Sequence, residues 1–422
     1  MLGASIVDQG GLGTATGSRN TIVGAANWRD LTTGQRNSFV GTDMAENATT
    51  ASYNTALGSS SLNALTTGTH NSSLGYQSLG KLTTGTYNIG IGHQAGYNAT
   101  TPNDTIAIGR GAISTGVLTG AGNVAIGKEA GNDLTSGEHN FFSGYQAGFN
   151  ATTPENTIAI GYAAIGSGVL TGDNNIVFGK WAGEDLTSGN LNFFAGFNAA
   201  SNATTATNSV AIGDNAMGLG VNTASTNVAI GSNSGYDLTS GGNNTFVGAY
   251  SGVNVTTGYD NTIIGRDAGD VLTTGFNNTI IGHDAAASAA GVNNEITLGN
   301  SSISSLRCQV QTISALSDRR DKKDIEELPL GIDFINTLKP VKFTWNMRDG
   351  AKVGEQEAGF IAQDLDKAQI DADAEDYLSL VLKNNPEKLE ASYGKLVPVL
   401  VKAVQELSAE VATLKKEIDN GK

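Results

Sequence analysis

The residues best able to do chemistry lie in one short run, Ser317-Asp318-Arg319-Arg320-Asp321-Lys322-Lys323-Asp324-Ile325. A serine hydroxyl is a weak nucleophile until a base takes its proton, and a lysine can be that base only where burial or neighbouring cations lower its pKa. No histidine competes for the role, because all four histidines precede the run: His70, His93, His139 and His283. From spacing alone, Ser-Asp before a basic run is usually a helix N-cap on a solvated surface.

The composition of the chain changes abruptly at Ser317. Residues 1–316 carry 9 Lys and Arg and 19 Asp and Glu, about 9% of the segment, whereas residues 317–422 carry 16 and 21, about 35%. Glycine changes the other way, since 50 of the 56 glycines precede Ser317. A change this sharp predicts a domain boundary.

Charge and cysteine usage exclude several classes of protein. A net charge of −15, with no basic cluster longer than that of the run, argues against nucleic acid as a partner. The first residues lack the basic and apolar regions of a secretory signal, and no apolar run approaches the roughly 18 residues of a membrane span, so we expect no membrane insertion. Cys308 is the only cysteine, which excludes disulfides within the chain and a cysteine-based metal site. The acidic residues 371–376 lack the glycine and glutamate of a calcium loop, so we expect no metal and no cofactor.

Before the boundary, a frame of Asn-x-x-apolar-Gly recurs, as in Asn20-Thr-Ile-Val-Gly24 and Asn123-Val-Ala-Ile-Gly127. Its sixteen intervals comprise thirteen of 17 residues and three of 18, counted between glycines 24, 41, 58, 75, 92, 109, 127, 144, 161, 179, 196, 213, 231, 248, 265, 282 and 299. This period predicts seventeen coils over residues 17–300, after a short N-terminal segment, 1–16.

Each coil is too short to bury an apolar face alone, so neighbouring coils must stack around one narrow core. The frame therefore predicts a mainly β fold, a β-solenoid (β-roll) shaft with two or three short strands per coil and asparagines stacked in hydrogen-bonded ladders. The apolar residue before each framing glycine, such as Val23, Leu74 or Ile160, is expected to point inward. At about 4.8 Å per coil the shaft would be roughly 80 Å long.

The residue after each framing glycine forms a column that is expected to face outward. Along the middle coils it reads Tyr76, His93, Arg110, Lys128, Tyr145, Tyr162, Lys180 and Phe197. Aromatic rings beside hydrogen-bonding side chains are what a sugar-binding surface requires, which makes Tyr76, Tyr145, Tyr162 and Phe197 candidate glycan contacts. A variable solvent face or a contact between chains is the alternative.

The frame resembles the head repeats of trimeric autotransporter adhesins and the glycine-rich shafts of phage tail fibres, which implies a homotrimer. After the last coil, residues 301–316 lose the frame and alternate apolar with polar residues, as a short stem or linker does.

Residues 317–422 are expected to form a small α/β domain. The pattern predicts a helix over 330–338, strands over 341–347 and 357–361, and a helix over 363–368. Val397, Leu400, Val404, Leu407, Val411, Leu414 and Ile418 are spaced alternately by 3 and 4 residues, which predicts a coiled coil over about 396–419. A helix buried in a larger core could show the same stripe, but charged flanking residues favour the coiled coil.

Four stretches carry a second resemblance: the run from Ser317, Leu338-Lys-Pro-Val-Lys-Phe-Thr-Trp345, Gly359-Phe-Ile-Ala-Gln-Asp-Leu365 and the segment 393–407. In this order they resemble the intramolecular chaperone auto-processing domain, the seventy-fourth serine peptidase family, found at the C-terminus of phage endosialidases, tail fibres and spikes and in the myelin regulatory factor. The resemblance implies self-cleavage between Leu316 and Ser317.

In that reading Ser317 is the nucleophile and Lys322 the general base, with Lys323 as the fallback, and Asp318 shapes the turn or orients the dyad. The enzyme is then a single-turnover serine endopeptidase that acts on no external substrate.

These features predict a phage tail-fibre or spike subunit, made in the host cytoplasm and carried on the virion. Its partners would be two further copies of the chain, other virion tail proteins and a host cell-surface glycan or protein receptor. Because a 17-residue period lets chains pair one coil out of register at little cost, a C-terminal domain that trimerises first would set the register and then be released by self-cleavage. A bacterial trimeric surface adhesin and a glycan-degrading spike are the alternatives, although no coil carries a distinctive pair of carboxylates.

Overall fold

The computed structural model describes residues 16–307, 309, 317–348, 350 and 352–421. The chain divides into two compact units, Met1–Leu298 and Gly299–Lys422, and each has its own architecture.

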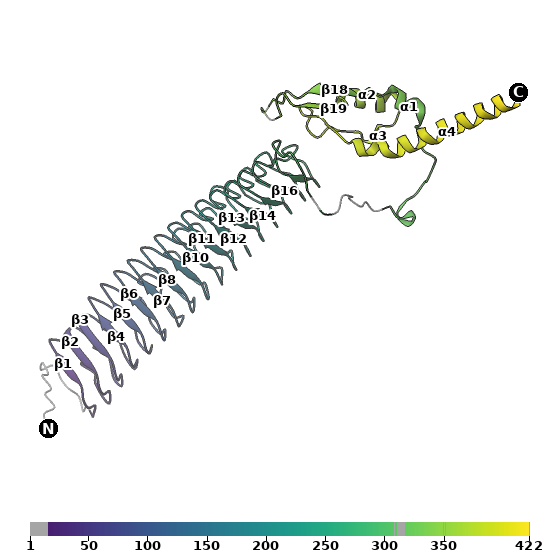
Figure 1. The fold of residues 1–422 in the computed structure, drawn as a ribbon. Coiled ribbons are helices and arrows are strands. Elements are labelled where there is room, and N and C mark those ends of the chain that lie inside the picture. The colour runs from purple at the N-terminus through teal and green to yellow at the C-terminus, as the bar shows by residue number, and fades with distance from the viewer. Residues whose placement is uncertain (1–15, 308, 310–316, 349, 351, 422) are drawn as a thin grey trace. The chain divides into compact units, whose positions relative to one another are not determined.

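The first unit is a parallel β-solenoid in which each coil contributes one short strand to a single seventeen-stranded sheet (Figure 1). Consecutive strands pair in parallel without slippage, as Val124 with Phe141 and Phe141 with Ile158. The strands are β1 (Thr21–Val23), β2 (Ser38–Thr42), β3 (Thr55–Ser59), β4 (Ser72–Leu74), β5 (Ile89–Ile91), β6 (Ile106–Ile108), β7 (Val124–Ile126), β8 (Phe141–Ser143), β9 (Ile158–Ile160), β10 (Ile176–Phe178), β11 (Phe193–Ala195), β12 (Val210–Ile212), β13 (Val228–Ile230), β14 (Thr245–Val247), β15 (Thr262–Ile264), β16 (Thr279–Ile281) and β17 (Ile296–Leu298).

The predicted β-solenoid is confirmed, but the coil contains one strand rather than two or three. The rest of each coil is a series of turns that still bond to the next coil, as where the Thr135 amide donates to the Thr152 carbonyl at 2.9 Å. Tight turns replace further strands because each coil is rich in glycine and in residues with positive φ, such as His139 at 56° and Gln146 at 54°.

The prediction that the residue before each framing glycine points inward is wrong. Val23 is 38% exposed and Leu74 45%, whereas the second residue of the strand, such as Phe39 or Ala56, is buried. Side chains alternate between the two faces of a strand, so the inward phase is set by the buried asparagine two residues before this second position. The apolar residue before the glycine consequently lies on the outer face of the sheet.

The core of the solenoid is built from the second residue of each strand and from two columns outside the sheet. Three residues after the framing glycine a small residue is buried, as at Ala95 and Ala130, and seven residues after it a leucine is buried, as at Leu65 and Leu134. Both columns point toward the strand, and stacking of the coils gathers these side chains into two core clusters, one from Ile22 to Leu82 and the other from Ala95 to Val292.

Buried asparagines form the predicted ladders along the solenoid. The amide N–H and the side-chain Nδ2 of Asn244 both donate to Oδ1 of Asn227, at 2.9 and 3.2 Å, and Nδ2 also donates to the Gly258 carbonyl at 2.8 Å. Oδ1 of Asn244 accepts the same pair of bonds from Asn261, each at 3.0 Å. Every polar atom of the buried amide is therefore satisfied, and each rung ties one coil to both neighbours.

The framing glycines are required by geometry. Gly144 has a φ of 135°, and a Cβ atom at this position would lie 2.4 Å from the carbonyl oxygen of Gly161 in the next coil. Both the backbone conformation and the close approach of the coils exclude a side chain.

The second unit is a small α/β domain. It contains η1 (Arg319–Asp321), α1 (Ile332–Thr337), β18 (Val341–Thr344), β19 (Gln356–Gly359), α2 (Ala362–Asp371), α3 (Glu375–Leu378), β20 (Val381–Leu382), β21 (Glu390–Ala391), η2 (Tyr393–Leu396) and α4 (Val397–Asn420). The pairs β18–β19 and β20–β21 are antiparallel. Leu330, Phe334, Leu365, Leu378 and Val399 are among the residues of its core.

Helix α4 joins this core along one face and leaves another face exposed. Val399 and Ala403 are buried, and a carboxylate oxygen of Glu406 accepts a 2.8 Å hydrogen bond from the Ile332 amide, which caps α1. The seven residues of the predicted heptad seam lie on the exposed face, with exposed fractions between 41% for Val411 and 65% for Val404. The stripe is therefore not the buried face of a core helix. None of the described helices is long and apolar enough to cross a membrane.

Candidate functional site

The short 3₁₀ helix η1 brings the two predicted dyad residues together. Asp318 is its N-cap and Lys322 its C-cap, so the turn folds the chain back between Ser317 and Lys322. As a result, Nζ of Lys322 donates a hydrogen bond to Oγ of Ser317 at 2.6 Å. The turn therefore places the two predicted dyad residues within hydrogen-bonding distance of each other.

Asp318 holds the turn in place. Its Oδ1 accepts a 2.8 Å hydrogen bond from the Arg320 amide, and its Oδ2 forms a 2.6 Å ion pair with Nη2 of Arg320. The Arg320 side chain, and after it the Arg320 amide, lower the pKa of the Asp318 carboxyl. Asp318 thus binds Arg320 and supports the turn, as one of its two predicted roles requires.

Lys323, the predicted fallback base, points elsewhere. Its Nζ lies 3.7 Å from Oδ2 of Asp324, and its side chain is 91% exposed. Leu316, the other residue of the predicted cleavage site, lies outside the described residues.

The dyad is open to solvent in the single chain. Both Ser317 and Lys322 are exposed, and no residue of η1 is buried. A lysine accepts a proton only in its neutral form, which desolvation favours and solvent opposes. In the single chain the two predicted dyad residues are thus in contact but not buried.

The comparisons with known proteins identify the domain that contains this turn. Residues 317–374 match the family described as the chaperone of endosialidase, a peptidase family, and the match begins at Ser317 itself. No curated protein matches the chain. The chain thus combines a β-solenoid with a C-terminal chaperone-peptidase domain of this family's type. The family supports self-processing and a role in chain trimerisation for the C-terminal domain, and it points to a phage tail protein.

The second group of predicted site residues lies on the solenoid, where the column after the framing glycines does face outward. Tyr76, Tyr162 and Phe197 are 48%, 46% and 43% exposed. Tyr145 and Tyr162 stack at 4.9 Å between ring centroids, and Nζ of Lys128 lies 4.7 Å from the Tyr145 ring. Tyr76 stands apart from this group and stacks on His93 at 5.4 Å.

One aromatic residue of this surface escaped the sequence analysis. Trp181 follows its framing glycine by two residues, so it lies outside the column of residues that directly follow the glycines. Its ring packs against Tyr162 at 6.0 Å and Phe197 at 5.4 Å, and Nζ of Lys180 lies 3.8 Å from its centroid. The signal was available in the sequence, as the only tryptophan in the middle coils. We name the set Lys128, Tyr145, Tyr162, Lys180, Trp181 and Phe197 the aromatic column.

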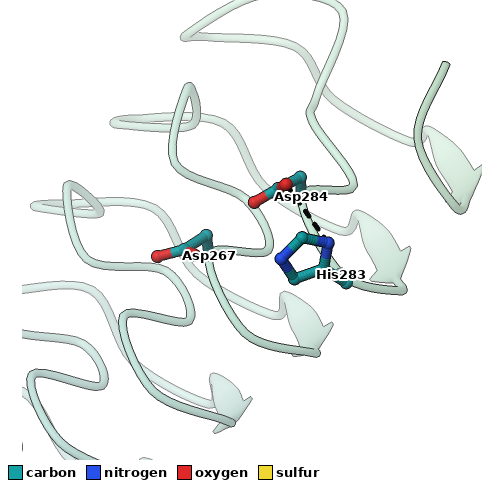
Figure 2. A group of neighbouring side chains, drawn as sticks. All are labelled: Asp267, His283 and Asp284. Carbon is teal, nitrogen blue, oxygen red and sulfur yellow. Dashed lines mark ion pairs between the residues drawn. The ribbon is translucent and has the colours of Figure 1, made fainter. Parts of the chain in front are cut away.

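Near the end of the solenoid, Asp267, His283 and Asp284 form a cluster of possible metal ligands (Figure 2). His283 Nδ1 lies 3.2 Å from Oδ2 of Asp284. The Arg266 guanidinium pairs with Asp267 at 2.7 Å and also contacts Nε2 of His283. Because Arg266 already pairs with Asp267 and contacts His283, we interpret the cluster as a charge network between neighbouring coils and assign no metal to it.

Proposed function

We propose that the chain is a phage tail-fibre or spike subunit whose C-terminal domain assembles three copies and then cuts itself from the shaft between Leu316 and Ser317. The observation that carries this proposal is the 2.6 Å hydrogen bond between Lys322 and Ser317 at the start of the segment that matches the chaperone of endosialidase family.

In the proposed reaction, neutral Lys322 takes the hydroxyl proton of Ser317, and Oγ attacks the carbonyl carbon of Leu316. The bond between this carbon and the Ser317 nitrogen breaks, the proton passes from Lys322 to the departing nitrogen, and the Leu316 acyl group is left as an ester on Oγ. Water hydrolyses the ester, which yields the Leu316 carboxylate and restores the hydroxyl. The products hold no second scissile bond beside the dyad, so the enzyme turns over once.

Assembly would precede the cut. The dyad is exposed in one chain, and burial against a neighbouring copy would favour the neutral lysine that the reaction requires. Helix α4 offers the means of assembly, because its heptad seam is exposed along the whole helix and a coiled coil would cover it. Cleavage after assembly then makes the aligned shaft hard to take apart.

The released shaft would contact the host surface. The aromatic column offers exposed and half-buried rings and two lysine ammonium groups over several successive coils, which suits a glycan. The double variant Tyr145→Ala/Tyr162→Ala should lose at least tenfold in binding to an array of bacterial surface polysaccharides, whereas Tyr250→Ala, an exposed tyrosine of a later coil, should bind as wild type. Equal binding by all three proteins would remove the glycan part of the proposal.

Denaturing gels and light scattering test the assembly and processing parts together. Wild type should run as a shaft and a small C-terminal fragment, and Ser317→Ala as one band near 43.3 kDa, with a mass near three chains in solution. A single-chain mass for Ser317→Ala would contradict the assembly role.

A further inference from the structure

The outer face of the solenoid sheet carries an apolar strip that the single chain leaves uncovered. We define the outer strip as the first and third residues of each strand from β1 to β17. All of these positions are half-buried or exposed, and they are apolar except for serine or threonine at 21, 38, 55, 72, 143, 245, 262 and 279. None of these described positions carries a charged side chain.

The strip is most apolar in its centre. From β5 to β13 the two positions hold isoleucine, valine or phenylalanine, apart from Ser143 and Ala195. Ile91, Ile126, Ile160 and Ile230 are each between 36% and 38% exposed although they stack on the coils above and below. Monomeric proteins rarely expose contiguous apolar patches larger than a few hundred Å². The outer strip runs over seventeen coils, so it exceeds this area even if each coil adds only tens of Å² of exposed apolar surface.

Another exposed column shows what a solvated face of this solenoid looks like. It consists of one threonine or serine per coil: Thr33, Thr50, Thr67, Thr84, Thr101, Thr119, Ser136, Thr153, Thr171, Ser188, Thr205, Thr223, Ser240, Thr257 and Thr274. All of them are exposed. The same repeat therefore keeps small hydroxyl side chains where it meets water and aliphatic ones on the outer strip, so the strip's composition is not a general property of the coil surface.

We infer that the outer strip is the face through which copies of this chain pack together along the shaft, so that the strips of three parallel copies enclose a common apolar core. The inference deepens the proposed function, since it rests on self-association and assigns the surface that performs it. Copies of this chain are the fitting occupant because a parallel copy presents the same residues at the same spacing on every coil. The exposed seam of α4 would hold such copies parallel and in register.

The aromatic column and the outer strip share no residue, because the members of the aromatic column follow the strands and do not belong to them. Packing of the outer strips would thus leave separate residues for a ligand, and the two roles can be tested independently.

Cross-linking of single cysteines in the full-length chain tests the inference. In a Cys308→Ser background, Ile160→Cys places a thiol on the strip and Thr153→Cys places one on the exposed threonine/serine column a few residues away. Both substitutions leave the buried columns intact. A bifunctional maleimide that spans about 10 Å suits the test, because packed sheets lie about that far apart. Leu407→Cys, in the α4 seam, reports on assembly through the coiled coil.

We expect Ile160→Cys to yield covalently linked chains and Thr153→Cys to yield at least tenfold less. Equal linking at both positions, or linking at Thr153→Cys alone, would overturn the inference. Linking at Leu407→Cys with none at Ile160→Cys would also overturn it while leaving the proposed assembly intact. Linking at none of the three positions would count against both the inference and the proposed function.

Discussion

Nζ of Lys322 lies 2.6 Å from Oγ of Ser317, and five residues of chain suffice to bring the two atoms together. The contact needs only the η1 turn and its Asp318 cap, and it involves no residue from the core of the C-terminal domain. Ser317 and Lys322 can therefore meet in a single chain, so in the proposed reaction assembly would have to supply desolvation rather than alignment.

Asp318 should affect the rate of self-cleavage but not its dependence on pH. Its pKa is lowered by Arg320, so the stabilisation from the ion pair is complete above the ordinary aspartate pKa of about 3.9 and is lost only as pH falls through the lowered value. Between pH 5 and 8 the carboxylate stays ionised. Asp318→Asn should therefore slow cleavage several-fold by a constant factor over this range.

Asp321→Asn, in the same turn, is the matched control and should cleave at the wild-type rate. Cleavage followed by gel over a pH series measures both variants. A change in the shape of the profile for Asp318→Asn would show that this carboxyl takes part in proton transfer instead of holding the turn.

The asparagine ladder should contribute measurably to the stability of the shaft. Asn244→Ala removes a side-chain amide that bonds to Asn227, Gly258 and Asn261, and it takes the side-chain partner from the buried Gly258 carbonyl and the Asn261 backbone amide. Such a loss costs about 1–3 kcal/mol of unfolding free energy. Chemical denaturation monitored by circular dichroism should show an earlier transition for Asn244→Ala, while Thr257→Ala, on the exposed column of the same coil, should unfold as wild type.

The framing glycines should not tolerate a methyl group. Gly144→Ala must adopt a φ of 135° and approach the Gly161 carbonyl, so we expect a loss of at least about 1–3 kcal/mol from backbone strain alone. Gly291→Ala is the control, because the atom nearest to its added Cβ is the Thr274 hydroxyl oxygen at 3.3 Å, which a side-chain rotation can move. Similar unfolding midpoints for both variants would contradict the tight stacking of the coils.

The exposed seam of α4 should control the number of chains. Leu407→Lys places a charge on the seam, whereas Ala409→Lys adds the same charge two residues on, away from the seam. Light scattering should give a mass near one chain for Leu407→Lys and near three for Ala409→Lys. If cleavage depends on assembly, Leu407→Lys should also remain uncut, and rapid cutting of a single-chain Leu407→Lys would contradict that order of events.

Much of the fold followed from the sequence because its signals are periodic and local. The 17-residue spacing predicted the stacked coils, and the heptads predicted a helix whose Val404 and Leu407 do lie on the surface. The direction of the apolar column before the glycine was wrong, since the buried phase depends on which polar residue faces inward, and Asn227 and Asn244 do so only because they satisfy one another. Burial of an asparagine is a property of the stack and cannot be seen in one repeat.

In the candidate site, too, some contacts could be predicted from the sequence and others could not. The pairing of Ser317 with Lys322 was expected from the family resemblance, whereas the spacing alone favoured a helix N-cap on a solvated surface. The role of Arg320 as the partner of Asp318 was missed, as was Trp181 beside Lys180, because these contacts depend on side-chain directions that residue spacing does not determine.

Intact mass spectrometry of purified wild type, Ser317→Ala, Lys322→Met and Lys323→Met tests the central claim most directly. We expect wild type and Lys323→Met to yield two species whose masses place the break between Leu316 and Ser317. Ser317→Ala and Lys322→Met should each give one species near 43.3 kDa. A break at another bond, or a cut that persists in Ser317→Ala or Lys322→Met, would contradict the account.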